Sequence, residues 1–431
     1  MINRNDDQRV VVTGMGVVTP IGEEPTEFYN SLLKGRSAIK RLTSFDTSRI
    51  YCKIGGDLPD WDIKVHLKNY GENYPSELAQ RALHYLRDIP LPAHIVAASA
   101  LQAYTSACVS GQYRPERFGH ILGGHNLNTW YAIENFKVFD EEPEFTDPLY
   151  LPRRLDTNVL GVTSEILNLK GPAWTVGAAC ASGNVAVASA TDLLRAGRAD
   201  AMLATCTVET PELVGLQSLS LLGALSLDTF IDEPWRASRP FDKRREGLVP
   251  GACGGAVILE TLAGARRRGA PILAEILGTG SCSDASSLTK PDSDGMARAM
   301  QIALDDAGIN PEQVEYINAH ATSTPVGDVA EVQAIKAVFG EHAYHIPVNA
   351  TKSMTGHPLT GTGVVELVVT IMQMRNHVLH PTINQEEPDP ECDLDFVPNQ
   401  AREYRFNIAL SNGFGFGGLN TAIVVGRAPC S

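Results

Sequence analysis

Apolar runs broken by glycine dominate the first half of the chain. The residues at 9–19 (RVVVTGMGVVT) are largely β-branched, and apolar runs recur at 201–206 and 255–260, so each of the three predicts a buried strand. A further strand is predicted at 272–280 (ILAEILGTG), and like the first it carries a Gly-x-Gly step. This fresh start predicts an internal duplication with a boundary near Ala270.

In the second half of the chain, segments with the apolar spacing of a helix alternate with short apolar segments typical of strands. In 294–307 the apolar residues fall on one helical face and Gly308 follows, which predicts an amphipathic helix. Further helices are predicted at 328–339 and 361–375, and strands at 314–318, 346–349, 407–411 and 419–425. Strands that alternate with helices indicate an α/β protein with mixed sheets.

Charge and cysteine content narrow the function classes. The 431 residues carry a formal net charge of −14, which argues against nucleic acid as a partner because phosphate binding needs a basic face. The eight cysteines form no CxxC pair, so neither a metal site nor a disulfide framework is indicated. The N-terminal segment is polar, and no apolar run reaches the roughly 18–20 residues that cross a bilayer. We therefore expect a cytoplasmic protein that does not enter a membrane.

One cysteine lies among unusually small residues. Cys180 sits in 176–184 (VGAACASGN), between a predicted strand at 173–176 and a predicted helix at 185–196. A helix N-terminus favours an anion and should lower the pKa of the thiol, while small neighbours let a carbonyl carbon approach the sulfur. A nucleophile and a small buried cysteine are both open readings of this turn.

In three later stretches, predicted strands are followed by further residues that could take part in chemistry. His320 follows the strand at 314–318, Lys352 and His357 follow the strand at 346–349, and a glycine loop is expected at 411–418. Ligands of α/β proteins collect at the carboxyl ends of strands. These three side chains and Cys180 are therefore expected to form one site.

Two other patterns have a structural explanation. Residues 413–418 match G-x-G-x-x-G, but a strand follows where a dinucleotide fingerprint would open a helix, so we reject that reading. Asp328 and Glu331 could be catalytic carboxylates. Their spacing is also that of a helix N-cap and its partner three residues on, and we favour this structural role.

Taken together, the motifs resemble those of the β-ketoacyl-acyl-carrier-protein synthases, in particular the type I/II condensing enzymes. The similarity spans nearly the whole chain, with matching segments at 10–22, 180–183 (CASG), 238–247 (SRPFDKRREG), 318–328 (NAHATSTPVGD), 351–357 (TKSMTGH), 380–384 (HPTIN) and 413–420 (GFGFGGLN). The resemblance implies a thiolase-like fold of two duplicated halves, 1–270 and 271–431, stacked in five α-β-α-β-α layers. It also implies a homodimer, with a heterodimer as the alternative.

The resemblance also assigns catalytic roles. Cys180 matches the acylated nucleophile, and the N–H groups of Cys180 and Phe416 would form an oxyanion hole beneath a gate made by Phe416. His320 and His357 match the paired histidines that stabilise an enolate. Lys352 and Glu366 match the lysine and the buried carboxylate that support them. Decarboxylative condensation of an acyl-cysteine with a malonyl-carrier thioester would follow, with no metal or redox cofactor.

The substrate contacts implied by the resemblance are less uniform. Thr322 and Thr324 match hydroxyls beside the phosphopantetheine arm of an acyl carrier protein. Asn126 falls near the gate position of the acyl pocket, with Leu127 beside it. The bulky segment 123–131, which includes Trp130 and Tyr131, replaces small residues of the family. It points away from long saturated chains and towards a free-standing polyketide-pathway enzyme, unless these side chains turn outward.

Two alternatives and a docking question accompany the assignment. A malonyl-carrier decarboxylase or a chain-length partner subunit would share the fold, but members of those classes typically lack the cysteine that is present here as Cys180. A carrier protein is usually acidic, so docking on this acidic chain needs a local basic patch. Candidates are 153–154, 243–245 and 266–268, and for the last of these we favour simple solvent exposure.

Overall fold

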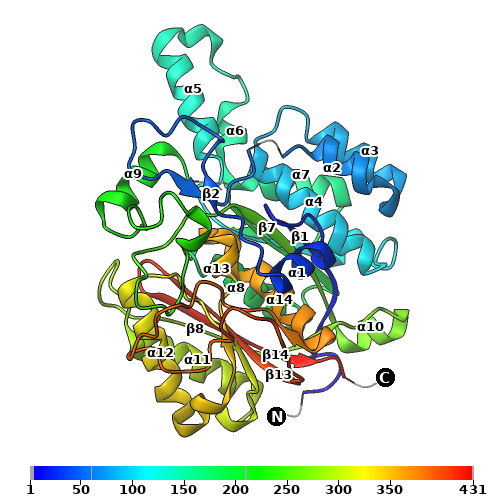
Figure 1. Cartoon of the computed structure of the whole chain (residues 1–431). Helices are drawn as coiled ribbons and strands as arrows, with labels where there is room; N and C mark the ends of the chain where they lie inside the picture. Colours follow the sequence, from blue (N-terminus) through cyan, green and yellow to red (C-terminus); the bar gives the residue numbers. More distant parts are fainter. Residues whose placement is uncertain (1–3, 60, 209–210, 430–431) are drawn as a thin grey trace.

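The computed structural model describes residues 4–59, 61–208 and 211–429, and in that part of the chain ten strands form one mixed sheet (Figure 1). In sheet order they are β10 (Val348–Asn349), β9 (Tyr316–Asn318), β13 (Ile408–Gly415), β14 (Leu419–Arg427), β8 (Ala274–Ser283), β1 (Val10–Val18), β7 (Cys253–Thr261), β6 (Ala201–Val208), β4 (Phe118–Gly123) and β5 (Ala173–Val176). Two short ribbons lie apart, β2 (Lys40–Arg41) with β3 (Ile54–Gly55) and β11 (Val378–Leu379) with β12 (Arg402–Glu403).

The two halves of the sheet repeat one pairing pattern. Outward from the centre, β1-β7-β6 pair antiparallel, and β4 and β5 then add in parallel. On the other side, β8-β14-β13 pair antiparallel, and β9 and β10 then add in parallel. β1 joins β8 through three residue pairs, Val10 to Val12 against Ala274 to Ile276. The pairing order of one half of the sheet is therefore repeated in the other half.

Helices complete a five-layer stack. On the outer faces lie α4 (Leu91–Ser106) with α7 (Asp156–Leu167), and α11 (Ser293–Ala307) with α12 (Pro325–Phe339). Between the two halves of the sheet lie α8 (Ser182–Arg195) and α14 (Thr362–Asn376), each of which contacts strands of both halves. This is the α-β-α-β-α order that the family resemblance implies, and the two central helices are buried on most sides.

The two Gly-x-Gly steps have the same physical cause. A Cβ at Gly14 or Gly16 would lie 2.0 Å from a carbonyl oxygen of α4. A Cβ at Gly278 or Gly280 would lie 2.3 or 2.2 Å from a carbonyl oxygen of α11. Both central strands therefore have glycine where the outer helix packs directly on the strand backbone.

Several predicted boundaries are wrong by a few residues. β13 continues to Gly415, so most of the glycine loop predicted at 411–418 belongs to a strand. α8 begins at Ser182, which brings Cys180 closer to the helix start than predicted. α12 begins at Pro325 with Thr324 as its N-cap, so Asp328 lies inside the helix and cannot be the cap.

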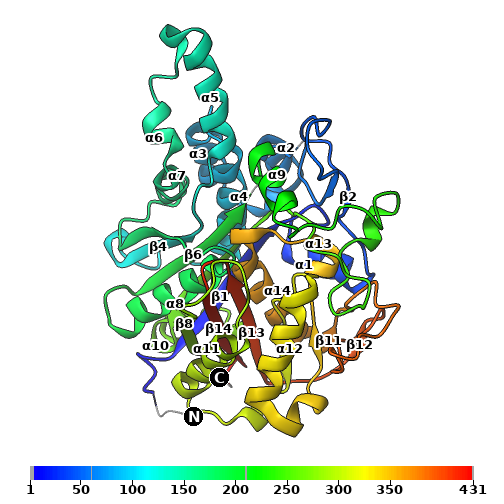
Figure 2. The same ribbon diagram turned by 90° about the vertical axis from the view of Figure 1, so that its left-hand side faces the viewer.

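The smaller helices lie around this stack. They are α1 (Pro25–Leu33), α2 (Ile63–Tyr70), α3 (Ser76–Tyr85), α5 (Thr129–Glu141), α6 (Tyr150–Arg154), α9 (Leu213–Leu221), α10 (Leu262–Arg268) and α13 (Lys352–Thr355). α5 and α6 project from the body as a pair (Figure 2). None of the helices in the described ranges is long and apolar enough to cross a membrane. All seven cysteines within those ranges are free, and Cys430 lies outside them.

Candidate active site

Cys180 occupies a tight turn between β5 and α8. Ala179 adopts a left-handed backbone conformation, with φ of 46°, which is rare for a residue with a side chain. The hydroxyl of Ser182 holds this turn, since it accepts from Ala178 N at 2.8 Å and donates to Ala179 O at 2.6 Å. Backbone strain of this kind persists where the surroundings enforce it, and here it presents the thiol at the helix start.

His357 brings the second half of the chain to this thiol. Its Nε2 lies 3.2 Å from Cys180 Sγ, and its Nδ1 lies 3.4 Å from the hydroxyl of Thr362. The backbone of His357 donates to Val249 O at 2.7 Å, which fixes the residue against the first half. The predicted meeting of the cysteine with this histidine is therefore present in the structure.

His320 lies beside His357, with ring centroids 5.3 Å apart and planes at 84°. Glu331, buried in α12, fixes the backbone here, because its carboxylate accepts from His320 N at 2.8 Å and from Ala321 N at 2.7 Å. The amide of Asn412 donates to the same carboxylate at 2.9 Å. The sequence left Glu331 open as a catalytic carboxylate and favoured an N-cap partner, whereas the structure shows it holding the histidine loop through tertiary contacts that spacing does not reveal.

A buried ion pair stands behind the histidines. Lys352 Nζ lies 2.6 Å from Glu366 Oε1, and both side chains are almost fully buried. Burial raises the pKa of Glu366 to about 7, and the nearby Lys352 opposes that rise. The pair thus places a positive charge close to the site without exposing it to solvent.

Both histidines are held neutral. Burial lowers the pKa of His320 and of His357 well below the usual histidine range, and the charge of Lys352 lowers both further. A neutral imidazole keeps one N–H donor and one free lone pair. The two rings can therefore donate hydrogen bonds to a developing oxyanion, or accept a proton, near neutral pH.

The thiol itself contradicts one expectation from the sequence. Burial raises the pKa of Cys180 to about 11, whereas the helix N-terminus alone would lower it. Lys352 and the backbone N–H groups of Cys180 and Phe416 act in the opposite direction but do not outweigh burial. The resting group is therefore a thiol, which needs a base such as the adjacent His357 to become a nucleophile.

The N–H groups that act on the sulfur are those predicted for an oxyanion hole. Phe416 follows β13 directly, and its side chain is 41% exposed above the cysteine turn. A Cβ at Gly415 would lie 2.7 Å from Ala178 O and 3.1 Å from Cys180 N. Only a glycine at 415 lets these two backbone segments approach closely enough for both N–H groups to face the thiol.

These groups open into one cavity of about 490 Å³. Its lining includes all four predicted substrate contacts, Asn126, Leu127, Thr322 and Thr324. The hydroxyls of Thr322 and Thr324 lie 3.0 Å apart. The cavity thus extends from the catalytic cluster both towards the hydroxyl pair and towards the loop before α5.

The bulky residues after Asn126 behave differently from one another. Trp130 lines the cavity and lies 5.0 Å from the ring of Phe45. Tyr131 instead turns away, and its hydroxyl donates to Asp147 at 2.5 Å. Of the two orientations left open for these rings, Trp130 therefore faces the cavity and Tyr131 turns outward. Asp156 fixes the loop, because its carboxylate accepts from the backbone N–H groups of Asn126 and Leu127.

The fold and the site together define a ketosynthase-type condensing enzyme, and comparisons with known proteins agree. The family models "Beta-ketoacyl synthase, N-terminal domain" and "Beta-ketoacyl synthase, C-terminal domain" match residues 7–265 and 273–386. A 3-oxoacyl-[acyl-carrier-protein] synthase 2 from Coxiella burnetii is 37% identical over 426 residues, which cover 98% of this chain and 99% of that protein.

Solved structures give the same result. A β-ketoacyl synthase from Burkholderia phymatum is 31% identical with a TM-score of 0.86, over 98% of this chain and 100% of that one. A type II polyketide ketosynthase, solved with its acyl-carrier protein, is 30% identical with a TM-score of 0.85, over 98% and 99%. The chain belongs to the β-ketoacyl synthase family, and it is an acyltransferase with the thiolase-like fold of that family.

The raised pKa of Cys180 predicts how the thiol reacts with a small alkylating reagent. Only the thiolate attacks iodoacetamide, so the alkylation rate should rise about tenfold per pH unit between pH 6 and 9. Quantitative peptide mass spectrometry of 177–184 follows this cysteine apart from the others. A rate that levels off below pH 8 would show a thiolate already formed at neutral pH and would contradict the account.

Proposed function

We propose that the enzyme condenses an acyl group with a malonyl unit, both delivered on acyl carrier protein. The observation that carries the proposal is the 3.2 Å contact between Cys180 Sγ and neutral His357 at the base of a cavity. In the first step His357 takes the thiol proton and the sulfur attacks the carrier thioester. The N–H groups of Cys180 and Phe416 stabilise the tetrahedral oxyanion. The carrier thiolate then leaves and recovers the proton from His357.

The second step forms the carbon–carbon bond. The malonyl thioester loses its carboxylate as carbon dioxide, and the electron pair left behind becomes an enolate. His320 and His357, both neutral, donate hydrogen bonds to the enolate oxygen. The enolate carbon attacks the acyl-cysteine carbonyl, and the Cys180 thiolate leaves and takes up a proton from solvent. The product is a β-ketoacyl thioester on the carrier, and the sequence of steps balances without any redox or metal cofactor.

The carrier would present its phosphopantetheine arm along the hydroxyls of Thr322 and Thr324. A structural relative in this family is solved in complex with its acyl-carrier protein, which supports this partner. Of the basic segments predicted for docking, 266–268 is engaged by Asp6 and Glu260 through Arg266 and Arg268. Among the described residues that line the cavity, Lys290 is the single lysine or arginine, and it is exposed. We therefore propose that the acidic carrier docks where the cavity opens beside Lys290.

The acyl group is proposed to be short, polar or unsaturated, as in a polyketide-type pathway. Asn126 and Trp130 both line the cavity. A methylene chain against the amide of Asn126 would cost that amide its bonds to water without replacement, about 1–3 kcal/mol. A polar or shorter acyl group avoids that cost.

A second copy of the chain is the proposed partner in solution. β5 forms one edge of the sheet in the described chain, and its Trp174 is 41% exposed. The projecting α5–α6 pair, with the turn between its helices, exposes Phe136, Phe139, Phe145 and Leu151. Edge strands and exposed apolar patches of this kind are normally covered.

We also propose a cytoplasmic enzyme, since free thiols fit a reducing compartment.

The two chemical steps should respond differently to loss of a histidine. In His320→Ala one enolate donor is lost, so malonyl decarboxylation should fall by roughly 10²–10³. Loading of Cys180 should fall much less, because His357 remains beside the thiol. Single-turnover assays that follow carbon dioxide release and adduct mass separately measure both steps. Equal and small losses in the two steps would argue against this division of labour.

The amide at 126 should set the acyl preference. Wild-type enzyme should load short or polar acyl groups onto Cys180 in preference to a saturated sixteen-carbon chain, and Asn126→Ile should shift loading towards the long chain. Competitive loading with a matched set of acyl-carriers measures this. Asn73→Ile, at an exposed position of the 3-10 helix Gly71–Asn73 outside the cavity lining, controls for added surface hydrophobicity. Preferential loading of the sixteen-carbon chain by the wild type would refute the role of Asn126.

The exposed α5 surface predicts the oligomeric state. The wild type should have a solution mass near twice 46.5 kDa, and a double change of Phe136 and Phe139 to serine should lower the mass towards one chain. Light scattering coupled to size exclusion measures both. Ile302→Glu, on the opposite outer layer, should leave the mass unchanged. A monomeric wild type at micromolar concentration would contradict the proposal.

A further inference from the structure

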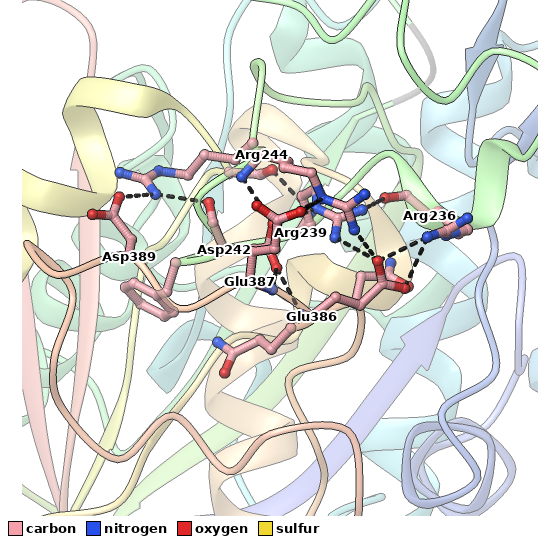
Figure 3. A network of polar contacts seen from close by, with 12 residues as sticks. Arg236, Arg239, Asp242, Arg244, Glu386, Glu387 and Asp389 are labelled. Carbon is pink, nitrogen blue, oxygen red and sulfur yellow. Dashed lines mark hydrogen bonds and ion pairs between the residues drawn. The ribbon is translucent and has the colours of Figure 1, made fainter.

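Arg245 lies in one of the basic segments that the sequence offers for carrier docking, but the structure buries it. Only 3% of its side chain is exposed. Its neighbours Arg239 and Arg244 belong to a network with Asp242 and Glu386, drawn in Figure 3. A buried guanidinium cannot contact a carrier protein at the surface, so the partners of Arg245 are groups inside the protein.

The contacts of Arg245 lead to the loop that carries the substrate hydroxyls. Nε donates to Thr324 O at 3.1 Å, and Nη2 donates to Pro325 O at 3.0 Å. Nη1 is anchored from behind by Asp389 at 2.6 Å and by Asp242 O at 2.8 Å. The planar guanidinium therefore spans the carbonyls of the N-cap Thr324 and of Pro325, the first residue of α12, with fixed geometry that a lysine cannot reproduce.

A second contact ties Arg245 to the same loop through a carboxylate. Arg245 Nε lies 3.6 Å from Asp328, which is fully buried and accepts from Ser323 N at 3.1 Å and from Phe241 N at 2.9 Å. Ser323 is held with φ of 67°, in the left-handed region. Burial raises the pKa of Asp328 to about 7, and the charge of Arg245 opposes that rise. The arginine thus holds the loop directly at Thr324 and indirectly, through Asp328, at Ser323.

We infer that Arg245 is a positioning residue for carrier substrates. By fixing the carbonyls of Thr324 and Pro325, it sets the direction of the Thr322 and Thr324 hydroxyls, which lie 3.0 Å apart in the cavity wall. Arg245 touches neither the thiol nor the two histidines among its described contacts. Its loss should therefore weaken binding of the pantetheine arm and leave the reactivity of Cys180 intact. This inference rests on the proposed carrier-dependent function.

Arg239 provides the matched control. Its side chain is fully buried in the same network, where it pairs with Asp242 and Glu386, and its guanidinium stacks over Phe230 at 4.4 Å. None of the described contacts of this guanidinium reaches the substrate loop. Arg239→Lys and Arg245→Lys therefore remove comparable buried guanidinium groups, and only one of them acts on the hydroxyls.

The test compares loading of Cys180 by an acyl-carrier thioester in the two variants. Arg245→Lys should raise the carrier concentration for half-maximal loading about tenfold, as expected for a lost charge-assisted hydrogen bond, with a maximal rate within about twofold of wild type. Arg239→Lys should keep the wild-type concentration. Alkylation of Cys180 by iodoacetamide should be unchanged in both, since that reagent does not use the hydroxyls.

A double-mutant cycle with Thr322→Val completes the test. If Arg245 acts through the hydroxyl pair, the double variant should lose less carrier binding than the sum of the losses in Arg245→Lys and Thr322→Val. Additive losses, or equal effects of Arg245→Lys and Arg239→Lys, would overturn the inference. Should Arg245→Lys fail to fold, Asp389→Asn loosens the anchor of the arginine, and it must then raise the same concentration for the inference to stand. Wild-type enzyme that loads no carrier substrate would overturn the proposed function itself.

Discussion

The contact between Cys180 and His357 is the interaction on which the rest of the site depends, because it joins the two halves of the chain. The cysteine turn follows β5 of the first half, and the histidine follows β10 of the second. The central helices α8 and α14 pack against each other between the half-sheets and hold both turns in place. A duplicated fold thereby builds one site from two sets of strand ends.

Burial governs the chemistry of that contact. It keeps the Cys180 thiol protonated and both histidines neutral, while the buried Lys352–Glu366 pair brings a charge near them. In such an environment an oriented N–H donor is worth more than in water. In the proposed mechanism the site therefore uses fixed neutral donors and proton transfer at the moment of attack, not a preformed thiolate.

The sequence pattern predicted the features that depend on neighbouring residues in the chain, namely the helices, the strands and the residues at strand ends. Apolar runs predicted the strands, and the two Gly-x-Gly segments suggested a duplication. Strand-end positions predicted that Cys180, His320, Lys352 and His357 lie close together. The resemblance supplied Glu366, Phe416 and the threonines. The pattern could not show that Glu331 would hold the histidine loop, or that Arg245 would turn inward. Those roles arise when distant segments bury a charged group and leave it one set of partners.

Covalent loading of Cys180 tests the central claim most directly. Incubation of the wild-type protein with an acyl-carrier thioester, followed by peptide mass spectrometry, should place one acyl group on Cys180 and none on the other cysteines. Added malonyl-carrier should then discharge that adduct into a β-ketoacyl product, while Cys180→Ala takes up no acyl group. A condensation product from the Cys180→Ala variant, or an acyl group stably attached at another residue, would contradict the account.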